Sequence, residues 1–224
     1  MQHIILVRHG ITEDMEKRLM QGSSDSPLSP RGREEARRTG EVLSTIAFDA
    51  AFASPLGRAW ETAQITAQPH AGLKVIPLND LHEMDFGFFE GKPFFASPDE
   101  EPHGMRRLFL LMKVLFAQIT GESLRSVSRR AVRSWKEISA RVPEGRLLIV
   151  SHGVLINYLL KHLLDEEVFK SLRTVGIKPC SITELKVPSA GSAKLIRFND
   201  TAHLINPEPG PSPKLVEIDN GGQE

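Results

Sequence analysis

The sequence is poor in cysteine, carries no excess charge and has no long apolar run, and each scarcity excludes a class of protein. Cys180, the only cysteine, cannot form an intramolecular disulfide framework or a cysteine-based zinc cage. Lys plus Arg and Asp plus Glu both total 28, so the basic excess typical of nucleic-acid or membrane-surface binding is missing. The most apolar segment, 108–116, is too short to span a membrane. Because the chain enters a predicted strand directly after His3, without a signal peptide, we expect a cytoplasmic protein that binds neither nucleic acid nor membrane.

Short aliphatic runs alternate with amphipathic segments along the 224 residues, which is typical of an α/β domain. Ser-Pro pairs at Ser29 and Ser54 indicate helix starts, because serine caps a helix and proline suits its first position. The pattern predicts strands at 4–7, 49–53, 74–78, 147–150, 181–187 and 193–198, and helices at 30–46, 55–67, 123–142 and 154–164. We therefore predict a three-layer α/β/α fold with a mostly parallel central sheet.

The alternation breaks between Gly91 and Gly121, and the composition changes again near the end of the chain. An irregular stretch precedes an apolar helix predicted at 105–119, and we interpret residues 92–121 as a helical insertion over the active site. Proline, glycine and charged residues dominate 207–224, so we expect a disordered tail there. The remaining chain, 1–206, is predicted to be a single domain.

Two of the predicted strands end in the same way, in a histidine followed by a glycine. The first strand leads into Arg8 and His9, and the strand at 147–150 leads into Ser151 and His152. In an open α/β sheet, residues just past the carboxyl ends of parallel strands line the ligand crevice. The two histidines, from opposite ends of the chain, can therefore share one site, and Arg8 suggests that this site binds a phosphoryl group.

Phosphoryl transfer needs cations around the phosphate oxygens, a nucleophile in line and an acid for the leaving oxygen. Arg8 and Arg58 offer planar guanidinium groups that match phosphate oxygens. Arg58 also lies in the first turn of the helix that we expect Ser54 to cap, where free N–H groups favour an anion. His9 and His152 supply a nucleophile and a donor, and Glu83 follows the third predicted strand as a candidate acid. Each residue alone has an ordinary structural explanation, and the combination carries the hypothesis.

These residues lie in motifs whose order resembles that of the histidine phosphatase (phosphoglycerate mutase-like) superfamily. The resemblance covers roughly 3–200, without 94–120. It rests on Leu6-Val-Arg-His-Gly-Ile-Thr12, Gln21-Gly22, Asp25-Ser-Pro-Leu28, Ser54-Pro-Leu-Gly-Arg-Ala-Trp-Glu-Thr-Ala63, Leu81-His-Glu-Met-Asp-Phe-Gly87, Glu90-Gly91, Gly121-Glu-Ser123 and Val150-Ser-His-Gly153.

The resemblance implies a role for each candidate site residue. His9 would be the nucleophile that becomes phosphohistidine, and Glu83 would donate a proton and later activate water. The phosphate pocket and its rim would be formed by Arg8, Gln21, Gly22, Arg58, His152 and Gly153. Two positions depart from the family pattern: Ile11 stands where a polar residue is usual, and Met15 where an asparagine commonly contacts phosphate.

No other histidine has a partner at metal-ligand spacing, so we expect no metal and no cofactor. Cys180 lies in an alternating segment typical of a strand, which favours a buried structural thiol over a nucleophile. The basic residues of the helix at 123–142 are interpreted as a solvated face: Arg125, Arg129, Arg130, Arg133 and Lys136.

The sequence thus favours a metal-independent phosphomonoester hydrolase that acts through phosphohistidine on a small or medium-sized phosphorylated metabolite. One alternative is a cofactor-dependent phosphoglycerate mutase, although the early tryptophan-rich loop typical of mutases is missing and the loop 86–91 resembles phosphatases. Another is a non-catalytic module that binds a phospho-ligand or a protein on the same fold. The sequence also allows a homodimer.

Overall fold

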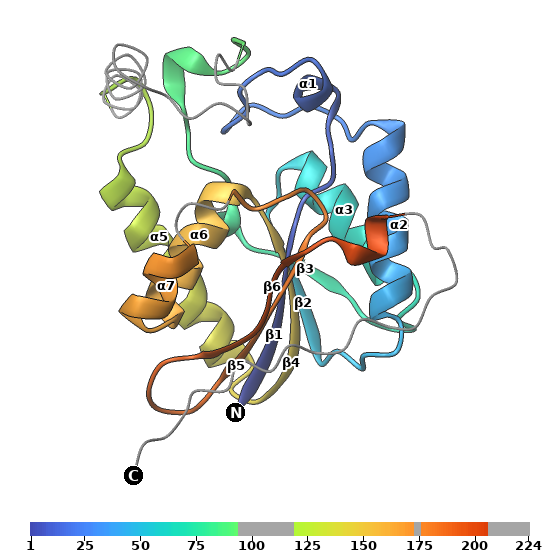
Figure 1. The fold of residues 1–224 in the computed structure, drawn as a ribbon, viewed down its shortest axis with the longest axis vertical. Helices are drawn as coiled ribbons and strands as arrows, with labels where there is room; N and C mark the ends of the chain where they lie inside the picture. Colours follow the sequence, from blue (N-terminus) through green and yellow to red (C-terminus); the bar gives the residue numbers. More distant parts are fainter. Residues whose placement is uncertain (94–118, 173–175, 206–224) are drawn as a thin grey trace.

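The structure is a computed structural model that describes residues 1–93, 119–172 and 176–205. Within them, six strands form one sheet in the order β3–β2–β4–β1–β5–β6 (Figure 1). The strands are β1 (Gln2–Arg8), β2 (Ala50–Ala53), β3 (Val75–Pro77), β4 (Gly145–Ser151), β5 (Ile182–Val187) and β6 (Lys194–Asp200). The neighbours β1, β4, β2 and β3 pair in parallel, whereas β5 is antiparallel to both β1 and β6. The prediction of a mostly parallel sheet is confirmed.

Helices cover both faces of the sheet and give the expected three layers. Figure 1 shows α2 (Pro30–Leu43) and α3 (Gly57–Ala67) on one side, and α5 (Leu124–Arg141), α6 (Gly153–Leu163) and α7 (Glu166–Leu172) on the other. A short helix, α1 (Glu13–Glu16), and three 3₁₀ turns complete the described elements. The turns are η1 (Asn79–Leu81), η2 (Gly87–Phe89) and η3 (Ala202–Leu204). No helix among the described residues is long and apolar enough to cross a membrane.

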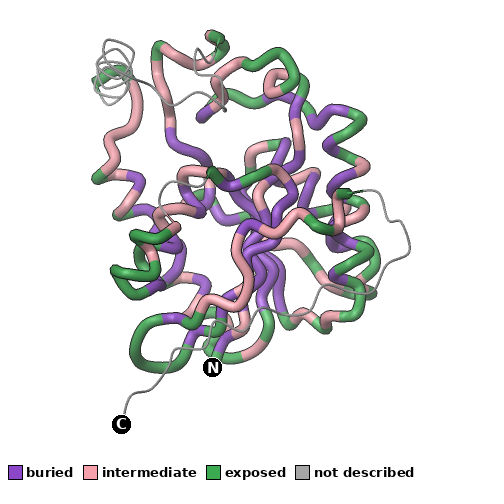
Figure 2. The backbone as a smooth tube through the Cα atoms, in the orientation of Figure 1, coloured by how far each residue is buried: buried purple, intermediate pink, exposed green. Residues whose placement is uncertain are grey.

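The aliphatic runs form the buried centre of the sheet. Successive residues of a strand point to opposite faces, so Ile4 and Leu6 of β1 pack towards α5 and α6, whereas Ile5 and Val7 pack in the cluster beneath α3. Each of these four side chains is at most 1% exposed. Figure 2 shows the central strands as a buried core between partly exposed helices, whereas the edge strands β3 and β6 are mostly half-buried. Burial on both faces explains why these runs are continuous rather than alternating.

Several helix starts follow the sequence signals, and one does not. The Ser29 side chain accepts a hydrogen bond from the Gly32 N–H, with Pro30 first in α2 as expected. Ser123 caps α5 by accepting from the N–H of Ser126. The prediction that Ser54 caps the following helix is wrong: α3 begins at Gly57, and its N-cap residue makes no side-chain cap bond.

The second Ser-Pro signal failed because a carboxylate from another segment takes the capping position. Asp25 accepts hydrogen bonds from the backbone N–H groups of Gly57 and Arg58, the first two residues of α3. Other boundaries differ slightly from the prediction, since α2 ends at Leu43 rather than at 46.

The predicted helix at 105–119 and the tail at 207–224 lie outside the described residues, apart from Ile119. The described ends of the predicted insertion lie close to the loops around the site. Leu19 forms an isolated bridge with Pro93 on one side, and the Glu122 N–H donates to the Asp85 carbonyl on the other. Pro93 therefore lies beside Leu19, and Glu122 lies beside Asp85.

Candidate active site

The two predicted histidines meet because their strands are direct neighbours in register. In the parallel pair β1–β4, Arg8 lies opposite Ser151, so the next residue of each strand is a histidine. The His9 N–H donates to the Ser151 carbonyl at 2.9 Å, and the rings of His9 and His152 lie 5.0 Å apart between centroids. Both side chains are buried. Two residues from distant parts of the chain therefore lie together at the carboxyl ends of neighbouring strands, as predicted.

One hydrogen bond fixes the reactive nitrogen of His9. Its Nδ1 lies 2.8 Å from the Gly10 carbonyl oxygen, which can only accept, so Nδ1 carries the ring proton. Nε2 therefore keeps its lone pair. Burial lowers the pKa of His9 well below its ordinary value, and the charges of Arg8 and Arg58 lower it further. The ring is thus held neutral, as a nucleophile must be.

The two arginines are each anchored by their terminal nitrogens and leave Nε without a protein partner. Arg8 donates from Nη1 to the Ile177 carbonyl at 2.5 Å, and its pKa is lowered mainly by burial, with Glu83 opposing the shift. Arg58, 1% exposed, donates to the Gly22 carbonyl at 2.6 Å and to a carboxylate oxygen of Asp25 at 3.0 Å. Both Nε atoms are buried and have no hydrogen-bond partner.

His152, like the two arginines, has a side-chain nitrogen with a protein partner and another without one. Its Nε2 lies 2.8 Å from the hydroxyl of Ser54, whereas its buried Nδ1 has no partner. Burial lowers the pKa of His152 well below the usual value, and the nearby His9, Arg58 and Arg8 add to the effect. Ser54, expected as a helix cap, instead orients this ring.

Unpartnered buried nitrogen atoms gather at the site. In the part of the chain that the structure describes, seven buried side-chain nitrogen or oxygen atoms have no partner, and four belong to Arg8, Gln21, Arg58 and His152. For Gln21 the atom is the amide Nε2, since its Oε1 accepts from Thr12 at 2.8 Å. A buried donor left unsatisfied costs about 1–3 kcal/mol. An anion bound here could accept hydrogen bonds from these nitrogens. Three of them belong to the predicted phosphate pocket and one, from Gln21, to its predicted rim.

Gly22 and Gly153, the two glycines predicted to belong to the site, differ in their surroundings. Gly22 packs so closely that a Cβ would overlap Glu90 and the Met84 carbonyl, and its own carbonyl holds Arg58. Gly153 is the first residue of α6, where the backbone N–H has no partner within the helix. A Cβ there would lie 3.6 Å from the Arg8 guanidinium carbon, so Gly153 lies beside Arg8 without steric need for glycine.

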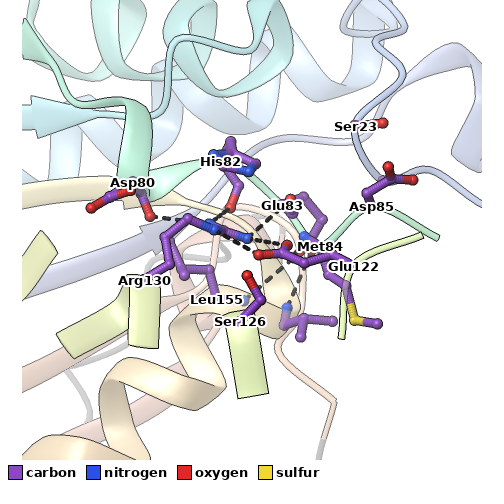
Figure 3. Close-up of polar contacts among 12 residues, drawn as sticks. Ser23, Asp80, His82, Glu83, Met84, Asp85, Glu122, Ser126, Arg130 and Leu155 are labelled. Carbon is purple, nitrogen blue, oxygen red and sulfur yellow. Dashed lines mark hydrogen bonds and ion pairs between the residues drawn. The ribbon is translucent and has the colours of Figure 1, made fainter. Parts of the chain in front are cut away.

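Glu83 is 5% exposed and lies at the first turn of α6 (Figure 3). One carboxylate oxygen accepts from the N–H groups of Met84 at 2.9 Å and Leu155 at 3.3 Å, and the other accepts from Val154 at 3.2 Å. Its charge also acts on Arg8. The candidate acid therefore lies beside the same helix start that His152 opens.

Sequence reasoning missed several supporting residues. Asp25 lies in one of the sequence motifs without a signal for its role, yet it caps α3 and pairs with Arg58. Thr62 accepts from the Gly10 N–H at 3.0 Å, and no local signal indicated this contact. The assignment of Arg130 to a solvated helix face is wrong, because this side chain is 3% exposed and hydrogen-bonded throughout.

Cys180 is buried, as expected, but it lies two residues before β5 rather than within it, with a φ of 49°. Burial raises the pKa of this thiol to about 12, which keeps it protonated and unreactive. Among the described side chains, no three histidine, cysteine, aspartate or glutamate residues are grouped to hold a metal ion.

Comparison with known proteins shows the family of this chain. The model of the histidine phosphatase superfamily (branch 1) matches residues 4–201, and the chain belongs to this superfamily. A probable phosphoglycerate mutase of Klebsiella pneumoniae is 34% identical over 214 residues, which are 92% of this chain and 97% of that protein.

Two solved structures share the fold over nearly their whole length. A mycobacterial glucosyl-3-phosphoglycerate phosphatase, solved with VO3, has a TM-score of 0.76 and 27% identity, covering 90% of this chain and 100% of its own. The α-ribazole phosphatase of Shigella flexneri has a TM-score of 0.73 and 25% identity, covering 88% and 96%. The similar proteins thus include both a probable mutase and phosphatases.

Proposed function

We propose that this protein hydrolyses phosphate monoesters through a phosphohistidine formed on His9. The observation that carries the proposal is the state of that ring: its proton is held on Nδ1 by the Gly10 carbonyl, and its pKa is depressed. The free Nε2 lies in a cluster with the unpartnered side-chain nitrogens of Arg8, Arg58 and His152. A binding site for phosphate needs the donors, but it needs neither a neutral nucleophile nor a buried carboxyl group.

In the first step, the Nε2 lone pair attacks phosphorus and the bond to the ester oxygen breaks. Glu83 protonates that oxygen, so an alcohol leaves and a carboxylate remains. The N–H groups of Met84, Val154 and Leu155 stabilise this carboxylate. The Nε atoms of Arg8 and Arg58 and a protonated Nδ1 of His152 bind the phosphoryl oxygens.

In the second step, water attacks the phosphorus of the phosphohistidine. Glu83 takes a proton from this water, the P–N bond breaks, and its electron pair returns to Nε2. Inorganic phosphate leaves, and His9 is again neutral with its proton on Nδ1. Glu83 ends protonated, ready for the next substrate. We infer a small or medium-sized phosphorylated metabolite as substrate.

A phosphoglycerate mutase is the second candidate, and the similarity to a probable mutase favours it. A mutase would return the phosphoryl group to a bound acceptor instead of to water. The resemblance of loop 86–91 to phosphatases and the similarity to two phosphatases support hydrolysis.

Measuring phosphate release and phosphoglycerate interconversion on the same enzyme separates a phosphatase from a mutase. Purified protein is given sugar phosphates, nucleotides, phosphoglycerates and phosphopeptides, and both inorganic phosphate and the interconversion of phosphoglycerates are followed. We expect phosphate release that survives EDTA, is lost in His9→Ala and is kept in His162→Ala, an exposed control on α6. Interconversion faster than phosphate release would identify a mutase, and neither activity would indicate a binding module.

A further inference from the structure

Arg130 on α5 is a buried guanidinium that no step of the proposed mechanism uses. Its side chain is turned towards the loop that carries Glu83 (Figure 3). Nη1 donates to the backbone carbonyls of Asp80 at 3.0 Å and His82 at 2.5 Å, and Nη2 donates to the carbonyl of Glu83 itself at 3.4 Å. One side chain therefore holds three carbonyls within four consecutive residues.

Glu122 neutralises this buried charge and orients it. Its two carboxylate oxygens accept from Arg130 Nε at 3.2 Å and Nη2 at 2.6 Å, in a bidentate pair. Although burial alone would raise the pKa of Glu122, hydrogen bonding to Arg130 holds it below its ordinary value. Together with the carbonyls, this pair engages every nitrogen of the guanidinium. The motif Gly121-Glu-Ser123 thus supplies the counter-ion.

The other carbonyls of the loop are also held. The Ser151 hydroxyl, next to His152 in the chain, donates to the Leu81 carbonyl at 2.7 Å. The Asn79 carbonyl accepts from the His82 N–H at 3.1 Å. Every backbone carbonyl from 79 to 83 therefore has a donor, so the loop has little freedom where Glu83 must be placed.

We propose that Arg130, oriented by Glu122, is a positioning residue that sets Glu83 for proton transfer; this inference rests on the proposed function. The guanidinium fixes the Glu83 backbone, while the α6 N–H groups fix its carboxylate. A planar fork with five N–H donors can hold three carbonyls and a carboxylate at once, whereas a lysine ammonium has only three. Loss of Arg130 lets the loop shift, and a misplacement of about 1 Å can cost about 10²-fold in rate.

A merely structural role would have different consequences, and the leaving group separates the two. An alkyl phosphate needs a proton on its departing oxygen, whereas p-nitrophenolate leaves almost unaided. A residue that acts through Glu83 must therefore slow alkyl phosphates selectively. A residue that only supports the fold lowers the rates for both substrates together.

The test compares Arg130→Gln, Glu83→Gln and the double variant with p-nitrophenyl phosphate and glycerol 2-phosphate under single-turnover conditions. Glu83→Gln should slow the alkyl substrate by about 10²–10⁴-fold, the typical value of general acid catalysis. Arg130→Gln should slow it by about 10–10²-fold and the aryl substrate by less than about threefold. In the Glu83→Gln background, Arg130→Gln should add almost nothing.

Arg133→Gln is the matched control, because Arg133 pairs with the Asp80 carboxylate of the same loop but is 61% exposed. We expect both rates to be unchanged in this variant. If Arg130→Gln does not fold, Arg130→Lys keeps the charge and part of the donor set, and it should show the same selective loss at smaller size.

Three outcomes overturn the inference. Equal losses for aryl and alkyl substrates in a folded Arg130 variant, while the wild type forms phosphohistidine, would refute the positioning role alone. Full additivity with Glu83→Gln would do the same. A wild type that neither hydrolyses the substrates nor becomes phosphorylated would instead remove the proposed function, and the inference would fall with it.

Discussion

At the scale of single residues, the site depends on which nitrogen atoms are occupied and which are left free. The Gly10 carbonyl accepts a hydrogen bond from Nδ1 of His9, and the Ser54 hydroxyl is hydrogen-bonded to Nε2 of His152. Carbonyl acceptors anchor Arg8 and Arg58 through their terminal nitrogens. What remains is one lone pair surrounded by donors, which is the arrangement that attack on a phosphoryl group requires.

We predict that the His9 ring of the free enzyme stays neutral well below pH 6.5, because burial and two neighbouring cations disfavour its charged form. A titration followed by ¹⁵N NMR of the imidazole measures this directly. Arg8→Gln removes one cation and should raise the pKa of His9, whereas Arg33→Gln, an exposed control, should not. A wild-type ring that titrates at its ordinary pKa would contradict this account.

The sequence predicted that His9 and His152 lie together, but it did not predict their partners. His9 and His152 could be placed because strand-end position is a rule of the fold and is visible in the chain. Their partners could not, because the contacts join residues far apart in sequence: Ser54 lies 98 positions from His152, and Ile177 lies 169 from Arg8. Such pairs depend on the packing of loops, for which local patterns carry no signal.

At the scale of elements, helix starts do most of the positioning. The first turn of α3 presents Arg58, and the first turn of α6 presents Gly153 and holds Glu83. In both helices, a carboxylate from another loop occupies the free N–H groups: Asp25 at α3 and Glu83 at α6. These contacts connect the loops of the site to the rigid helices.

Asp25→Ala should therefore lower the free energy of unfolding by more than about 1 kcal/mol, because it removes a helix cap and also the carboxylate that pairs with the buried Arg58. Urea unfolding monitored by circular dichroism measures the change. Glu41→Ala is the control, because Glu41 pairs with Arg37 on the exposed face of α2 and should cost at most about 0.5 kcal/mol. An Asp25→Ala variant as stable as the wild type would show that the carboxylate does not cap α3.

The same local signal succeeded in one helix and failed in another, for a physical reason. Ser29-Pro30 caps α2, but Ser54-Pro55 does not cap α3, because Ser54 is buried against His152 and Asp25 takes its place. Arg130 was wrongly predicted to be exposed because its neighbours on α5 are basic. It is buried because the loop that contains Asp80 packs on that helix. Element existence was predictable, whereas capping partners and buried charges were not.

At the scale of the whole molecule, the sheet order explains why residues near both ends of the domain form one site. β1 lies between β4 and β5, so the first strand of the chain is paired on both sides. The imidazoles of His9 and His152, which follow β1 and β4, are buried inside the domain. The pKa of each is lowered well below 6.5. Stability must therefore depend on pH.

The sign follows from proton uptake. In the unfolded chain His9 and His152 bind protons near about pH 6.5, whereas in the folded protein they do so only at lower pH. Stability should be full above that value and fall as the pH decreases below it. Urea unfolding between about pH 7.5 and about pH 5 measures this. Burial also raises the pKa of Glu35, so the histidine contribution is taken from the comparison with histidine variants.

The double variant His9→Gln with His152→Gln should show a clearly shallower pH dependence. A residual slope should remain, because burial also lowers the pKa of His203 and His70. His162→Gln, exposed on α6, should behave like the wild type. The account would be wrong if the double variant lost stability towards acidic pH as steeply as the wild type.

The central claim is that His9 carries the phosphoryl group, and rapid-quench labelling tests it most directly. Enzyme mixed with a ³²P-labelled phosphate monoester is quenched in base, digested and mapped by mass spectrometry. We predict label that is acid-labile and base-stable, on the peptide that contains His9, and no label in His9→Ala. Label on a serine, an aspartate or His152, or rapid phosphate release without any labelled enzyme, would contradict the account.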